Sequence, residues 1–215
     1  MSVHTCDLNF LSRSDGSGLY TLGNTVVLAS VNGPGDVKFS NRHYNKTHLE
    51  VVYSPRTGQS MITERAIEAL IRRTVEQVIL IRQHPRTAVN LTVQEMQDDG
   101  LTLACALNAS CMALMDAGVQ MKTTFAAVTA SITNEGTIII EPTLAQINES
   151  KAVITFVFEG QSFNVLATQQ EGCLDSDDFN LCLNKLQVAA KDIFSFYRRT
   201  LEEKYLKIGI GHLVK

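Results

Sequence analysis

The sequence feature that most constrains this chain is the run of small and apolar residues at 101–118, LTLACALNASCMALMDAG. Its apolar positions recur at helical spacing and leave almost no polar face. Gly118 follows the run, at the position where a glycine commonly ends a helix. A helix that is apolar on all sides must be buried. We therefore expect a central helix enclosed between other layers of the structure.

Much of the remaining chain has the patterns of strands and hairpins. Three hairpins are expected, with turns at Gly23-Asn24, Asn134-Glu135 and Gly160. Further strands are expected at 47–53 and 88–97, while 32–46 is rich in Gly and Asn and lacks an apolar period, which predicts a loop. Recurring hairpins predict antiparallel sheets.

Two more helices complete the expected fold. An amphipathic helix follows Gly58 and stops around His84-Pro85, because proline cannot continue a helix. A long final helix begins at Asp175 or Ser176 and reaches about Tyr205. The pattern predicts the α+β class, with antiparallel sheets around a buried helix and a long C-terminal helix. Since no linker interrupts the chain, one domain covering 1–215 is expected.

Composition argues against several classes of protein. No uninterrupted apolar run approaches the roughly 20 residues that a membrane-spanning helix needs, so no membrane contact is expected. The amino-terminal segment lacks the basic start and long apolar stretch of a signal peptide, which predicts an intracellular protein. The five cysteines show no CxxC spacing. Reduced thiols are therefore expected, with neither a disulfide framework nor a zinc site.

Charge is distributed unevenly along the chain. The net charge is −3, which argues against a strongly basic nucleic-acid binder. Residues 37–86 nevertheless hold nine Lys and Arg against four Glu, so this segment is +5 and the rest is −8. A basic region on an acidic molecule favours a directed contact with a polyanion. The alternative is a solvated surface with ordinary salt bridges, and the charge pattern leaves both open.

Standard catalytic motifs are absent from the sequence. There is no P-loop, GxGxxG, HExxH, GxSxG or EF-hand loop. Asp98-Asp99-Gly100 is typical of a turn, and the acidic residues at 175–178 are explained by a helix amino terminus. The histidines have no evident Asp or Ser partner. The residues alone therefore predict no catalytic group, no metal and no cofactor.

The arginines of the amphipathic helix allow two interpretations. Arg65 and Arg72 share a face with Glu68 and Glu76, where solvent-exposed salt bridges are expected. Arg73 falls beside the apolar stripe, so it needs an anionic partner. That partner is either an internal carboxylate or an external phosphate, and the spacing does not decide between them.

Several segments resemble the RNase PH family, and within it a non-catalytic RNase PH-type subunit of the eukaryotic RNA exosome core ring. The most specific is LTVQEMQDDGLTLACALNASCMALMDAG at 91–118, and the others lie at 14–34, 67–80 and 138–158. With the final helix they cover nearly the whole chain in the family's order. The resemblance implies an RNase PH-like domain, an expectation that agrees with the fold class given above.

The resemblance also implies where a phosphorolytic site would lie. Active members hold phosphate with two arginines and use two aspartates. Arg73 matches the arginine of the family's helix motif, but Leu103 stands where the second arginine is expected. Neither aspartate is present at the matching positions. The stretches that match the family's acidic motifs are Ile140-Glu141-Pro142, Gln146-Ile147 and Val153-Ile154-Thr155.

These departures lead to a hypothesis of function. The resemblance implies a subunit that lacks phosphorolytic activity, pairs with other RNase PH-like exosome subunits, and guides RNA during 3′-to-5′ processing and degradation in the nucleus, nucleolus and cytoplasm. The candidate phosphate or RNA contacts are Arg56, Arg65, Arg72, Arg73 and Arg86. The alternative is a homodimeric nuclease, or a nuclease partner, that acts on RNA or DNA through a rearranged acidic site. No cofactor is expected in either case.

Overall fold

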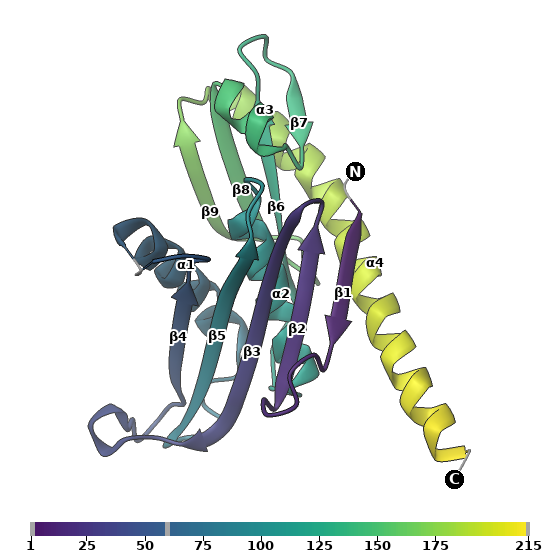
Figure 1. The fold of residues 1–215 in the computed structure, drawn as a ribbon. Helices are drawn as coiled ribbons and strands as arrows, with labels where there is room; N and C mark the ends of the chain where they lie inside the picture. Colours follow the sequence, from purple (N-terminus) through teal and green to yellow (C-terminus); the bar gives the residue numbers. More distant parts are fainter. Residues whose placement is uncertain (1–2, 59–60, 214–215) are drawn as a thin grey trace.

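The computed structural model describes residues 3–58 and 61–213. Over these ranges the chain forms two sheets and four α-helices (Figure 1). The elements are β1 (His4–Leu8), β2 (Gly16–Leu22), β3 (Thr25–Asp36), the 3-10 helix η1 (Phe39–Asn41), β4 (His48–Ser54), α1 (Ile62–Val78), β5 (Thr87–Gln97), α2 (Thr102–Asp116), β6 (Phe125–Ile132), β7 (Ile138–Ile140), α3 (Leu144–Glu149), β8 (Ala152–Glu159), β9 (Val165–Gly172) and α4 (Ser176–Leu213).

The first sheet has the strand order β1-β2-β3-β5-β4. Its neighbours are antiparallel except for β4 and β5, which pair in parallel from His48↔Ala88 to Ser54↔Gln94. The expected antiparallel pairing is therefore confirmed in this sheet except at this pair. The physical reason is that α1 connects β4 to β5, and a helical crossover returns the chain in the same direction.

The second sheet has the order β7-β6-β8-β9 and is antiparallel throughout. Its two expected hairpins, β6–β7 and β8–β9, are confirmed, as is the β2–β3 hairpin of the first sheet.

Helix α2 lies between the two sheets and is buried over most of its length. The buried polar side chain of Asn108 accepts from the backbone N–H of Ala127 at 2.8 Å and donates to its carbonyl at 3.0 Å. Strand β2 approaches closely on the other side, since a Cβ on Gly16 would lie 2.2 Å from the backbone nitrogen of Ala117. The expectation of an enclosed central helix is confirmed.

Helix α4 packs against the second sheet and β1, and its carboxyl-terminal part diverges from the sheets (Figure 1). Its buried stripe includes Leu186, Ala190, Ile193 and Tyr197. The helix runs further than the expected end near 205. No helix in the described part of the chain is long and apolar enough to cross a membrane.

Two further boundaries and two short elements differ from the expectations. The expected loop 32–46 is shorter because β3 continues to Asp36. Helix α1 ends at Val78 rather than near 84, where Ile79 becomes extended and bridges Met121. The short elements β1 and α3 have no counterpart in the sequence patterns that we used.

Candidate nucleic-acid interface and inter-sheet cavity

A cavity of about 180 Å³ opens between the start of α2 and the second sheet. We call it the inter-sheet cavity. It is lined by Ile67, Gly100, Thr102, Leu103, Thr129, Ile147, Val153, Thr155, Gln169 and Glu171.

The inter-sheet cavity offers an anion little attraction. Its one charged lining residue is the exposed Glu171, and none of its lining residues is a cation. The hydroxyls of Thr129 and Thr155 bond to each other at 2.8 Å, and the Thr102 hydroxyl donates to Asp98. A phosphate in this cavity would therefore meet mostly apolar walls, the Gln169 amide and a few hydroxyls, with no lining cation to balance its charge.

The structure brings together three of the positions to which the resemblance assigns catalytic groups. Leu103 from α2, Ile147 from α3 and Val153 from β8 line the same cavity, together with Thr155 of the same matched stretch. Arg73 does not line it, because its side chain is exposed on α1. Helix α1 contributes Ile67 to the wall instead.

The Asp98-Asp99-Gly100 segment forms the expected turn at the edge of the cavity. Gly100 has a φ of +94° and donates its N–H to Asp98 at 2.7 Å. Asp99 accepts from the amide of Asn24 at 3.1 Å. A Cβ on Gly100 would lie 2.6 Å from Cδ1 of Ile147, so the turn needs glycine for its φ and for the close approach of α3.

Glu141, which matches the family's acidic motif, is buried away from the cavity lining. Its carboxylate lies 2.9 Å from Nε2 of His4, whose Nδ1 is 2.9 Å from the hydroxyl of Tyr20. Burial raises the pKa of Tyr20 well above its ordinary value, so its hydroxyl stays protonated. The three side chains link β1 and β2 to the segment after β7. The sequence did not indicate this contact because β1 was not expected.

Arg72 and Glu68 cover the outer edge of β4. Arg72 lies 3.4 Å from Glu68 and donates to the carbonyl of Val51 at 3.4 Å, while the N–H of Tyr53 donates to Glu68 at 3.4 Å. The expected i,i+4 salt bridge is confirmed. Its two side chains also form hydrogen bonds with backbone groups of β4 that an edge strand leaves without a partner strand. Arg65 and Arg73 are exposed, and neither forms a salt bridge with any residue in the described ranges.

Arg86 belongs to a second cluster at the opposite end of β4. Its guanidinium carbon lies 5.3 Å from the centroid of the Tyr44 ring. We define the loop patch as Lys38, Phe39, Arg42, Tyr44, Lys46 and Arg86. Phe39 and Tyr44 are 84% and 70% exposed. Sequence reasoning noted the bases here but missed the two aromatic residues among them, which were visible in the letters KFSNRHYNK.

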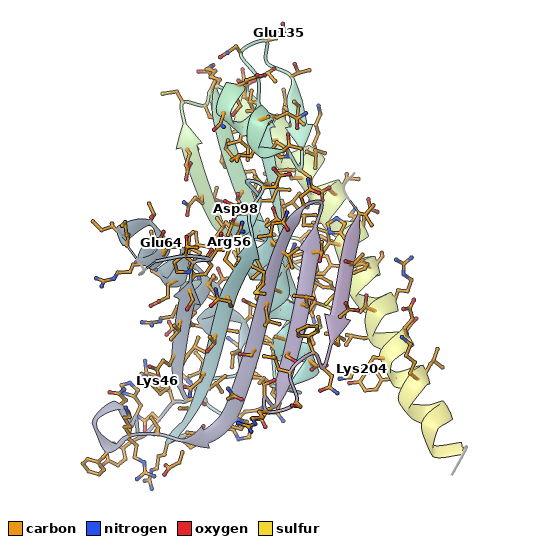
Figure 2. The ribbon with its side chains drawn as sticks, viewed as in Figure 1. Lys46, Arg56, Glu64, Asp98, Glu135 and Lys204 are labelled. Carbon is orange, nitrogen blue, oxygen red and sulfur yellow. The ribbon has the colours of Figure 1, made fainter. Side chains whose placement is uncertain are left out.

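The five candidate arginines thus fall into two groups. Arg56, Arg65, Arg72 and Arg73 lie after β4 and on α1, whereas Arg86 lies beside the loop before β4. Figure 2 shows Lys46 and Arg56 toward opposite ends of this strand. At ~3.3 Å per residue, β4 spans about 20 Å. Both groups lie outside the inter-sheet cavity lining.

Comparisons with known proteins agree with the resemblance. Residues 4–120 match the RNase PH family, described as the 3′ exoribonuclease family, domain 1. The chain is 31% identical to the exosome complex component RRP46 homolog of Caenorhabditis elegans, covering 93% of each chain. It is 28% identical to the exosome complex exonuclease RRP46 homolog of Arabidopsis thaliana, over 95% of this chain and 92% of that one.

A solved structure, the crystal structure of rice (Oryza sativa) Rrp46, resembles this fold with a TM-score of 0.90 and 30% identity, covering 94% of this chain and 95% of that one. The family match extends over more than half of the sequence, and the relatives are covered over nearly their full length. Both the expected fold and the expected likeness to exosome subunits are confirmed. The chain belongs to the RNase PH family.

Proposed function

We propose that this chain is an RNase PH-like subunit of an RNA exosome ring, which supports the ring and guides RNA during 3′-to-5′ processing and degradation without performing phosphorolysis itself. Its partners are other RNase PH-like subunits, and its location is that of the complex, in the nucleus, nucleolus and cytoplasm. The names and near-complete coverage of the similar exosome proteins support the assembly.

The observation that carries this proposal is the separation of positive charge from the inter-sheet cavity. Phosphorolysis needs cations that hold the attacking phosphate, and positioned groups of this kind commonly contribute roughly 10²- to 10³-fold each. The cavity supplies no lining cation, and Leu103 stands at a position where the family uses arginine. Four of the candidate arginines form no salt bridge with a described residue and lie instead on the outer flank formed by α1, the segment after β4 and the loop patch: Arg56, Arg65, Arg73 and Arg86.

This outer flank has the residue types of a surface that binds the sugar-phosphate backbone of RNA without sequence preference. Lys and Arg neutralise phosphates without sequence preference, and exposed aromatic rings stack on bases of any identity. The loop patch supplies both kinds of group, and Arg56, Arg65 and Arg73 supply further cations. Arg72 remains in the proposal only as a support for the β4 edge. The alternative of a nuclease acting on RNA or DNA gains no support from the cavity, whose single carboxylate is Glu171.

The test compares two triple variants of the full chain. One removes Lys38, Lys46 and Arg86, and the other removes Arg56, Arg65 and Arg73, each residue being replaced by Ala. Binding of a fluorescent single-stranded RNA is measured by anisotropy over a range of salt concentrations. Each lost phosphate contact lowers the slope of log K against log salt by about 0.7 for a single strand, so a slope decrease of roughly 2 is expected for each variant.

The matched control removes three bases elsewhere, Lys122, Lys185 and Lys207, which should leave the slope nearly unchanged. Equal losses in all three variants would mean that only total charge matters. Phosphate-dependent release of nucleoside diphosphates by the purified chain would contradict the non-catalytic part of the proposal.

A further inference from the structure

A groove of about 540 Å³ lies between α4 and the turn that joins β8 to β9. We call it the α4 groove. It is lined by Gly160, Phe163, Lys191, Phe194, Ser195, Arg198, Arg199 and Glu202. The six helical residues follow i, i+3, i+4, i+7, i+8 and i+11 spacing, so they form one stripe about 16 Å long at 1.5 Å per residue.

The α4 groove carries an excess of unpaired positive charge. Lys191, Arg198 and Arg199 face one carboxylate, that of Glu202. None of the three cations takes part in a salt bridge with another described residue. Arg199 is held over the ring of Phe196 at 5.9 Å. Several positive charges concentrated on one helix face attract an anionic partner.

Two aromatic side chains lie beside these charges. The ring of Phe163 meets that of Phe194 edge to face, with centroids 5.9 Å apart, and the Lys191 ammonium lies 5.3 Å from the Phe163 centroid. Phe163 has a φ of +55°, which is strained for a bulky side chain. Gly160 permits Thr124 and Phe194 to approach the turn, because a Cβ there would lie 2.4 Å from Oγ1 of Thr124 and 3.2 Å from Cε1 of Phe194.

These contacts favour a peptide over a nucleic acid. Phe163 already engages Lys191, and Phe194 also packs edge to face on Tyr197 at 6.0 Å, so a stacked base would displace existing contacts. An aliphatic side chain fills the space beside the ring edges without displacing them. In addition, the Glu202 carboxylate can accept an N–H from an extended peptide backbone, whereas a phosphodiester group has no such donor.

We propose that the α4 groove binds an acidic peptide segment of another protein, with one apolar side chain beside Phe163 and Phe194 and flanking carboxylates on Lys191 and Arg198. About five extended residues span the groove at ~3.3 Å each. This site is separate from the RNA-binding flank, and the inference does not depend on the proposed function.

The test uses a fluorescein-labelled peptide of ten residues, in which Phe-Leu is flanked by Asp and Glu. Three further probes replace Phe-Leu by Ser-Ser, replace the acids by their amides, or consist of a ten-nucleotide single-stranded RNA. The full chain should bind the first peptide, and the first two replacements should each weaken binding by roughly tenfold or more, because both the apolar and the charged contacts contribute.

Variants locate the site. The double substitution Lys191→Glu and Arg198→Glu should abolish peptide binding, whereas the matched pair Lys185→Glu and Lys207→Glu, with the same charge change on the same helix, should not. Phe163→Gly relieves the positive φ, so the fold is retained while peptide affinity falls. Circular dichroism before each titration establishes that the variants are folded.

Three outcomes would overturn the proposal. Equal losses in the two charge-reversal pairs would indicate non-specific attraction. RNA binding that depends on Lys191 and Arg198, without peptide binding, would assign the groove to nucleic acid. Loss of assembly with neighbouring RNase PH-like chains in the Lys191 and Arg198 variant, again without peptide binding, would make the groove a ring contact. None of these results depends on the RNA measurements proposed for the loop patch.

Discussion

Leu103 stands where the resemblance to the RNase PH family places an arginine that holds phosphate. It lies in the first turn of α2 and lines the inter-sheet cavity beside Thr129 and Val153. An arginine here would place a charge among apolar walls, with Glu171 as the one carboxylate of the lining. Leucine is compatible with these neighbours, which supports a packing role for the position.

The structure requires glycine at position 100 for its positive φ and for the close approach of α3. Comparing Ala substitutions at Gly100 and at Gly136 should separate these two effects. Gly100→Ala forces alanine to a φ of +94° and pushes its Cβ toward Ile147 and Leu144, so the free energy of unfolding should fall by about 1–3 kcal/mol. Urea unfolding measures this loss. Gly136→Ala is the control, because its φ is +81° with no atom within 4 Å of the added Cβ. Equal losses at both sites would mean that the contact with α3 contributes nothing.

Several residue roles could be predicted from the sequence, and others could not. The salt bridge of Arg72 with Glu68 and the turn at Gly100 are local, so spacing was sufficient. The contact of Glu141 with His4 joins residues far apart in the chain and depends on a strand that was not expected. Arg73 was expected beside the apolar stripe but is exposed, and its role in phosphate or RNA binding stays a prediction.

At the scale of elements, α1 and β4 depend on each other. The helix supplies Arg72 and Glu68 to backbone groups of β4, and its buried face, which includes Ile71 and Val75, packs beneath the sheet. Strand β4 gains cover for an edge that would otherwise be open to pairing with another chain.

Removing Arg72 should therefore destabilise the protein more than removing its neighbour. Arg72→Ala leaves the Val51 carbonyl and Glu68 without this donor, so the free energy of unfolding should fall by about 0.5–1.5 kcal/mol. The exposed Arg73→Ala should change it by less than about 0.5 kcal/mol. A double-mutant cycle with Glu68→Ala, measured by urea unfolding, tests the coupling. Strictly additive effects would show that the two side chains do not cooperate.

The sequence predicted the long elements and the hairpin strands, including the three-residue β7 beside its turn, and it missed two short elements that have no hairpin turn of this kind. The periods of α1, α2 and α4 and the hairpin turns are local signals. Strand β1 has five residues at a sheet edge and α3 has six, too few for a period to emerge. The parallel pairing of β4 with β5 follows from the α1 crossover. It was not predicted because the recurring hairpins elsewhere in the chain favoured antiparallel pairing throughout.

At the scale of the whole molecule, buried thiols and phenols make stability depend on pH. Burial raises the pKa of Cys111 from 9.0 to about 12, and it raises the pKa of Cys105, Tyr20 and Tyr197 as well. In the unfolded chain these groups lose their protons at lower pH than in the folded chain. Above pH 9 the folded state therefore binds more protons, and its stability decreases as the pH rises.

We expect the free energy of unfolding to decrease between pH 9 and 12, by up to about 1.4 kcal/mol per pH unit for each such thiol. Urea unfolding at a series of pH values measures the slope. Cys111→Ala should reduce the slope, while substitution of the exposed Cys173 should not. If the dependence of the free energy of unfolding on pH had the same slope in the wild type and in both cysteine variants, the contribution of Cys111 would be contradicted.

The position of α2 between the two sheets has a consequence for how the protein can change over time. The family match ends at residue 120, just after this helix. The helix nevertheless packs against the first sheet on one side and against the second sheet on the other. A swap of either half between related proteins would bring a foreign surface against α2. Neither half can therefore be exchanged without changing this interface, and a substitution on α2 alters its packing against both sheets.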